Sequence, residues 1–169
     1  PGAKEKEVMD GMKVKRFHYG LGKYETLASN QGILPALKKS KWNYFKIPFF
    51  LIGEFFALRK EIKENGPDIV HAHWIIPQGF IAAICKKLYG VEYVVTTHGG
   101  DIFGLQGEIM TSIKRFTLKN AKRITVVSNA IKKEIHKKID QNLSIEVISM
   151  GVDGSKFNPK ERDNLIKKK

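Results

Sequence analysis

The chain has 169 residues, of which 42% are hydrophobic and 28% are charged. This length and composition fit one globular domain with its own core, and they exclude a disordered chain and a disulfide-stapled miniprotein. The formal net charge of +13 favours anionic partners such as phosphorylated ligands, nucleic acid or an acidic membrane, although a lysine-rich solubilising surface explains it equally well.

The N-terminal part of the chain has few regular signals. The expected elements are, in order, a loop (1–12), a strand (13–19), a mostly irregular stretch with a short helix near 34–39 (20–41), and a helix (49–64). Gly66 and Pro67 supply a C-cap glycine and a helix breaker at the end of the last of these.

From residue 69 the sequence becomes a regular alternation of apolar runs and amphipathic stretches. We expect strands at residues 69–72, 93–97, 123–128 and 144–149, with helices at 78–89, 108–120 and 129–139. Such an alternation is typical of βαβ units. The predicted fold class is therefore α/β, a Rossmann-like, mostly parallel sheet with helices on both faces.

Cys85 is the single cysteine, so no internal disulfide can form. It lies in an apolar run, and we expect a buried, inert thiol rather than a nucleophile. One cysteine is also consistent with a reducing cytoplasm. The most apolar region, residues 42–58, is interrupted by a lysine, a proline, a glycine and a glutamate, which excludes a membrane span of about 20 mostly apolar residues.

Polar loops follow two neighbouring strands of the predicted sheet. His73 and Trp74 come after the first strand, and His98-Gly-Gly-Asp101 comes after the second. Ligands of open α/β sheets bind at the carboxyl ends of the strands, so we expect both loops to line one cleft. The two glycines allow close approach of a ligand to the backbone and positive φ angles.

Four sequence segments carry a resemblance to a known family. They are DIVHAHW (68–74), VVTTHGGDIFG (94–104), KNAKRITVVSNAIKKEI (119–135) and VISMGVDGSKF (147–157). In this order and spacing they resemble the N-terminal half of family 4 glycosyltransferases, which are retaining, GT-B-fold enzymes that use nucleotide-sugar donors. Met150 stands where the family usually has an asparagine, whereas Gly151 and Asp153 match.

The resemblance also implies a domain organisation. Residues 1–159 would form part of the N-terminal, acceptor-side domain, with its first strands missing, and residues 160–169 would be a basic tail or the start of a linker to an absent donor-binding domain. Such a fragment would expose a sheet edge and would be inactive alone. The implied partners are a nucleotide-sugar donor, held mostly by the absent domain, and a glycan or lipid-linked acceptor. No cofactor is expected.

The resemblance places the histidine of the second loop in the cleft where acceptor and donor sugar meet. A histidine and a carboxylate suit sugars, because each hydroxyl both donates and accepts hydrogen bonds. We therefore predict His98 and Asp101 as catalytic. The predicted acceptor-binding residues are His73, Trp74, Gly99, Gly100 and Ser128.

Each of these residues has a structural alternative. Asp101 can cap a turn, Trp74 can belong to the core, and Ser128 is more readily explained as a helix N-cap than as a phosphate contact. His71 and His73 face the same side of a strand, but a metal site needs a third ligand, and we expect no metal. His71 is expected to be a hydrogen-bonded packing residue.

Residues 42–56 hold seven aromatic side chains. We favour a core helix and its lead-in, because packing explains the helical stripe beyond Phe49. The alternative is a segment that dips into an anionic membrane surface next to a lipid-linked acceptor, and the preceding Lys38-Lys-Ser-Lys41 fits it. The expected location is accordingly cytoplasmic, extending to a peripheral position on the inner face of the cell membrane.

A rival function of another class is a non-enzymatic anion- or nucleic-acid-binding α/β module, supported by the net charge of +13. Nucleic acid is the less favoured partner, because the basic residues are scattered without the aromatic interleaving of a stacking platform. Another GT-B enzyme, such as a sugar-nucleotide epimerase, resembles the four segments less. The favoured function is glycosyl transfer in polysaccharide or glycolipid biosynthesis, of the hexosyltransferase type.

Overall fold

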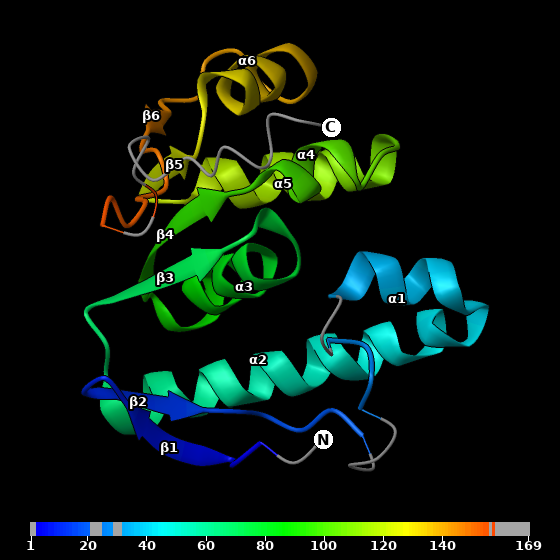
Figure 1. Ribbon diagram of the computed structural model, residues 1–169, viewed down its shortest axis with the longest axis vertical. Coiled ribbons are helices and arrows are strands. Elements are labelled where there is room, and N and C mark those ends of the chain that lie inside the picture. Colours follow the sequence, from blue (N-terminus) through cyan, green and yellow to red (C-terminus); the bar gives the residue numbers. More distant parts are fainter. Residues whose placement is uncertain (1–2, 21–24, 29–31, 156, 158–169) are drawn as a thin grey trace, which may run out of the picture.

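The computed structural model describes residues 3–20, 25–28, 32–155 and 157 (Figure 1). A parallel sheet with its helices lies above the long helix α2, and a small hairpin lies alongside α2. The predicted basic tail, residues 160–169, falls outside the described residues.

The sheet contains four parallel strands in the order β3-β4-β5-β6. Their bounds are β3 (Ile69–His73), β4 (Glu92–Thr97), β5 (Arg123–Val126) and β6 (Glu146–Val147). Burial alternates along β4, where Tyr93, Val95 and Thr97 are fully buried and the residues between them are half-buried. The predicted α/β class, with a parallel sheet flanked by helices, is confirmed.

The helices of the βαβ units are α3 (Phe80–Tyr89), α5 (Glu108–Asn120) and α6 (Asn129–Lys138). The three helices pack on the sheet face that carries Val95 and Val126, and together they form one core cluster. The helices contribute Ala82, Ala83, Leu118, Ile131 and Ile135 to it. The opposite sheet face, which carries His71 and His73, is less covered. The Cys85 thiol is buried, as predicted, and burial raises its pKa to about 11.

The N-terminal part differs more from the prediction. Residues 1–12 were expected to form a loop, yet β1 (Lys6–Met9) and β2 (Met12–Lys15) form an antiparallel hairpin. Its turn is Asp10-Gly11, with φ angles of 50° and 80°. Asp-Gly is a strong signal for a two-residue hairpin turn, so the sequence contained the information.

Three helices follow the hairpin: α1 (Ile33–Lys39), the 3-10 helix η2 (Lys41–Phe45) and α2 (Lys46–Asn65). The short helix expected near residues 34–39 is confirmed, and the helix expected at 49–64 begins one turn earlier. Gly66 closes α2 in the left-handed region with a φ of 52°, as the C-cap prediction requires. Within the part of the chain that the structure describes, no helix is long and apolar enough to cross a membrane.

Two short helices occupy the loops at the strand ends. The turn η3 (Ile75–Gly79) follows β3, and α4 (Gly99–Phe103) follows β4. The sequence predicted a glycine loop in the second position, because glycine is a poor helix former. These two elements position the residues of the candidate site.

Candidate functional site

The carboxyl ends of β3 and β4 bring the two predicted loops together. His73 lies opposite Thr96 in the parallel register, so the residues after each strand meet at the same edge. The Nδ1 atom of His73 is 3.3 Å from the Nε2 atom of His98, and the Trp74 ring is 5.0 Å from the His98 ring. The predicted meeting of the loops is confirmed, while the roles of their residues stay predictions.

Three histidines form a row across this end of the sheet. The rings of His71 and His73 are 4.5 Å apart, and those of His73 and His98 are 5.6 Å apart. Burial, and then the neighbouring His73, lower the pKa of both His71 and His98. Both rings are therefore neutral near pH 7, and each offers one nitrogen that donates and one that accepts.

A hydrogen-bond chain anchors this row to the sheet. The Nε2 atom of His71 lies 2.7 Å from the Thr96 hydroxyl, which lies 2.7 Å from the Thr125 hydroxyl. The bond fits the role predicted for His71, although its side chain is exposed rather than packed inside. The described residues contain no group of three or more histidine, cysteine, aspartate or glutamate side chains that could hold a metal ion.

Trp74 lies at the surface rather than in the core. It is 40% exposed, and its backbone has a φ of 80°. A Cβ atom on Gly100 would come within 2.7 Å of the Trp74 ring, whereas one on Gly99 would meet only the Phe103 ring at 3.7 Å. A side chain at position 100 would therefore have to displace the Trp74 ring. Neither glycine has the positive φ that the sequence led us to expect.

Asp101 is buried, with 1% of its surface exposed. Its Oδ2 atom accepts hydrogen bonds from the backbone N–H groups of Ile75 and His98, both at 3.1 Å. Burial raises its pKa to about 6, against the opposing effect of these two bonds and of Lys114. The carboxylate joins the loop after β3 to the loop after β4.

This geometry favours the capping alternative for Asp101, while its predicted catalytic role stays a prediction. The Oδ2 atom is used by the backbone, whereas the Oδ1 atom is buried without a hydrogen bond. The capping alternative fits, since Asp101 is the third residue of α4 and accepts from the N–H group of His98, the N-cap. Through this bond the Asp101 side chain holds the backbone of His98 at the start of α4.

Ser128 also follows its structural alternative. It is the N-cap of α6, and its Oγ atom accepts from the Ile131 backbone N–H at 3.4 Å. Its oxygen is thus used by the helix terminus, as the N-cap interpretation predicts.

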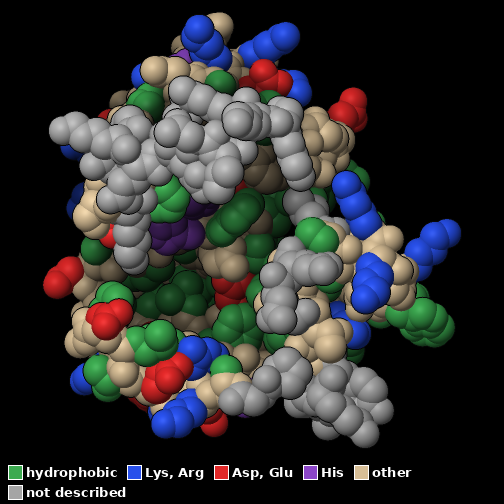
Figure 2. Space-filling model, in the orientation of Figure 1, with side chains coloured by type: hydrophobic (Ala, Val, Ile, Leu, Met, Phe, Trp, Pro, Cys, Tyr) green, Lys and Arg blue, Asp and Glu red, His purple; other side chains and the backbone are tan. Residues whose placement is uncertain are grey.

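A cavity of about 720 Å³, which sequence reasoning missed, adjoins the histidine row. It lies between β3, α2 and the β1–β2 hairpin, and its rim includes His71, His73 and Trp74. Figure 2 shows this hollow, lined by hydrophobic side chains, with histidine side chains at its margin. Within the described ranges β3 pairs with β4 alone, so its other edge faces the cavity.

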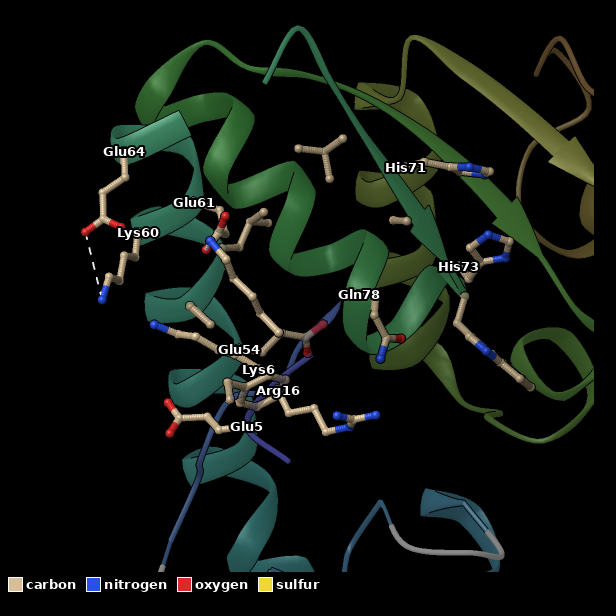
Figure 3. Close-up of a pocket in the computed structure, with 17 residues that line it drawn as sticks. Glu5, Lys6, Arg16, Glu54, Lys60, Glu61, Glu64, His71, His73 and Gln78 are labelled. Atoms are coloured by element: carbon tan, nitrogen blue, oxygen red, sulfur yellow. Dashed lines mark hydrogen bonds and ion pairs between the residues drawn. The ribbon is translucent and has the colours of Figure 1, made fainter. Parts of the chain in front are cut away.

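Two polar groups inside the cavity have no described partner. Glu54 on α2 and Gln78 on η3 point into it from different walls (Figure 3). The Glu54 Oε2 and Gln78 Oε1 atoms are buried without a hydrogen bond, and burial raises the pKa of Glu54 to about 7. In the sequence, the only sign of a buried polar group here was the position of Glu54 within the apolar run of residues 42–58.

Comparison with known proteins identifies the family. The sequence matches Glycosyltransferase Family 4 over residues 19–156, which is most of the chain. The chain belongs to this family. The resemblance on which the sequence prediction rested is confirmed.

Two curated relatives are glycosyltransferases by name. An uncharacterized glycosyltransferase, MJ1178 of Methanocaldococcus jannaschii, is 28% identical over 116 residues, which cover 68% of this chain and 30% of the relative. The putative teichuronic acid biosynthesis glycosyltransferase TuaC of Bacillus subtilis is 28% identical over 109 residues, covering 62% and 28%. The chain thus spans less than a third of the length of either relative.

Solved structures show the same fold. Sucrose-phosphate synthase from Thermosynechococcus elongatus aligns with a TM-score of 0.64 and 13% identity, over 92% of this chain and 37% of that one. A second structure of sucrose-phosphate synthase from this organism aligns with a TM-score of 0.64 and 14% identity, over 93% of this chain and 74% of that one. The arrangement is that of a Rossmann-like half of a GT-B fold.

Proposed function

We propose that this chain is the acceptor-side part of a retaining glycosyltransferase of the hexosyltransferase type. It would act on a glycan or lipid-linked acceptor in polysaccharide or glycolipid biosynthesis, with a nucleotide-sugar as donor. The observation that carries the proposal is the convergence of His73, Trp74 and His98 at the carboxyl ends of β3 and β4, where open α/β sheets bind ligands. The name of one relative, for teichuronic acid biosynthesis, favours a polysaccharide product.

The site residues have distinct tasks in this proposal. Trp74 offers a flat apolar face against which a sugar ring packs. The neutral His98 ring accepts from, or donates to, the acceptor hydroxyl, and Asp101 holds the His98 backbone in place. The hydroxyl oxygen bonds to the anomeric carbon of the donor, and the departing nucleotide phosphate takes the electron pair of the broken bond. The proton of the acceptor hydroxyl passes to an oxygen of that phosphate.

The contribution of this chain is then orientation of the acceptor. Correct placement of two reactants lowers a barrier by removing the entropy cost of bringing them together. The groups that stabilise the departing phosphate belong, in this proposal, mainly to a donor-binding domain outside the chain.

The decisive variant is His98→Ala, made in the protein as its source cells produce it. We expect the wild type to transfer label from one of a panel of radiolabelled nucleotide-sugars to glycans or lipid extract. The variant should lose about 100-fold or more in kcat, as expected for loss of a positioned catalytic group. His136→Gln is the control, because His136 on α6 bonds to the Leu143 carbonyl and lies outside the histidine row.

Three outcomes contradict the proposal. One is absence of transfer from every donor tested, and another is a normal rate in folded His98→Ala. Turnover of donor by the purified 169-residue chain alone would contradict its assignment as the acceptor-side part only. Salt-dependent binding to nucleic acid in place of transfer would favour the anion-binding module.

A further inference from the structure

A cluster of large apolar side chains lies exposed at the N-terminal end of α2 and in η2. Along one helical stripe, Phe45, Phe49, Ile52 and Phe56 are 69%, 63%, 53% and 55% exposed. We define the aromatic tip as these four residues together with Trp42 and Tyr44, which are 75% and 56% exposed. The expected core stripe is present, since Phe55, Leu58 and Ile62 pack against buried residues of α3. For five of the seven aromatic side chains of residues 42–56, however, the expectation of a core position was wrong.

The same stripe changes from apolar to charged further along α2. Its continuation beyond Phe56 carries the exposed charged residues Lys60, Lys63 and Glu64. The face of a surface helix that points away from the core is normally polar along its whole length. The outward face of α2 is therefore apolar at its N-terminal end and charged at its C-terminal end.

The aromatic tip is surrounded by positive charge. No aspartate or glutamate occurs in the sequence from residue 26 to residue 53. Lys38, Lys39 and Lys41 are exposed beside the tip, while Lys46 donates to the Thr26 hydroxyl. In Figure 1 this end of α2, with α1, projects away from the sheet, and Figure 2 shows lysine and hydrophobic side chains together at that margin.

This chemistry distinguishes between the surfaces that can cover the tip. Protein interfaces are depleted in lysine, whereas tryptophan, tyrosine and lysine together are characteristic of the membrane–water interface. An apolar helix face with flanking lysines binds anionic bilayers by burying its apolar groups about 5–10 Å deep. We propose that the aromatic tip docks this protein on the surface of an anionic membrane.

The proposal is independent of transfer chemistry, since it concerns binding alone. If both hold, the strand-end site faces acceptors that are themselves attached to the membrane. Membrane binding without sugar transfer would support this inference and contradict the proposed function. Sugar transfer without membrane binding would contradict this inference and support the proposed function.

The test is sedimentation of the purified protein with vesicles of phosphatidylcholine, alone or mixed equally with phosphatidylglycerol. We expect binding to the mixed vesicles with a blue shift of Trp42 emission in a Trp74→Phe background, and loss of at least tenfold in affinity in Phe45→Ser/Phe49→Ser. Leu88→Ser/Ile109→Ser is the matched control, because Leu88 and Ile109 are 60% and 73% exposed but lie outside the tip. Circular dichroism establishes that each variant is folded.

A charge-reversal pair tests the lysines. Lys38→Glu/Lys41→Glu should remove the preference for anionic over neutral vesicles, while Lys133→Glu/Lys137→Glu, with the same change in net charge on exposed lysines of α6, should keep it. Equal loss in both pairs would mean that overall charge, not the tip, drives binding, and would overturn the proposal. Failure to bind anionic vesicles would also overturn it, as would a lipid-free dimer that Phe45→Ser/Phe49→Ser dissociates.

Discussion

The part of the chain before β3 and the part from β3 onward differ in how much of their apolar surface is buried. In residues 69–147 the inward faces of strands and helices enclose one another, and Tyr93, Val95 and Ile135 are fully buried. Before β3, Leu27 and Phe50 are the buried hydrophobic residues among those described, and the aromatic tip is exposed. The C-terminal part buries most of its apolar side chains within itself, whereas the N-terminal part leaves the apolar side chains of the aromatic tip exposed.

The largest expected effect comes from truncating a core residue in the C-terminal part. Ile135→Ala should lower the free energy of unfolding by about 3 kcal/mol, because it leaves a cavity among packed groups. Phe49→Ala removes more side chain but should change stability by less than about 0.5 kcal/mol, since Phe49 is 63% exposed.

Urea denaturation of both variants measures this contrast. Equal losses would contradict it, because they would mean that the aromatic tip is packed against protein in solution. A concentration-dependent loss for Phe49→Ala would point to a second copy as the covering surface.

A second prediction concerns the cavity between the two parts. Burial raises the pKa of Glu54 from its ordinary 4.5 to about 7, so the folded protein holds this proton more tightly than the unfolded chain. The stability that Glu54 contributes is fully present below pH 4.5 and is lost as the pH rises through about 7. Glu54→Gln should therefore be more stable than wild type at pH 8, by about 2 kcal/mol.

Unfolding at pH 4.5 and pH 8 checks this, with Glu64→Gln as the control on the same helix. Glu64 is exposed and lies 3.9 Å from Lys60, so its replacement should leave the pH dependence unchanged. If Glu54→Gln were less stable than wild type at pH 8, the carboxylate would have a cationic or donor partner in solution.

Local sequence patterns were sufficient to predict the strands of the C-terminal part. They were insufficient to predict which side chains of the N-terminal part are buried. Strands at residues 69–72, 93–97 and 123–128 were found because runs of β-branched residues report burial directly. The exposure of Phe49 and Phe56 was missed, because spacing identifies a helical stripe but not what lies against it. The meeting of His73 with His98 was predictable, since parallel strands end at one edge.

The details of the site depended on contacts distant in sequence. Asp101 bonds to Ile75, which is 26 residues away, and no local pattern reports that a carboxylate will be enclosed there. The close contact between Gly100 and the Trp74 ring likewise joins residues that are distant in sequence. The unpartnered Glu54 was visible only as an interruption in an apolar helix.

A small effect on stability is expected where the two parts meet, at Trp74, which lines the cavity and packs on Gly100. A methyl group on Gly100 must displace the Trp74 ring, but it also favours the helix α4, by about 1 kcal/mol. Gly100→Ala should therefore change stability by less than about 1 kcal/mol while shifting Trp74 emission.

Gly99→Ala gains the same helix preference without the clash, because its Cβ atom has room beside Phe103 at 3.7 Å. Both variants are best made in a Trp42→Phe background, so that Trp74 alone reports. An emission shift in Gly100→Ala but not in Gly99→Ala would show that the ring packs on this glycine in solution. Identical spectra would mean that the ring leaves Gly100, and the strand-end site would then lack its fixed apolar face.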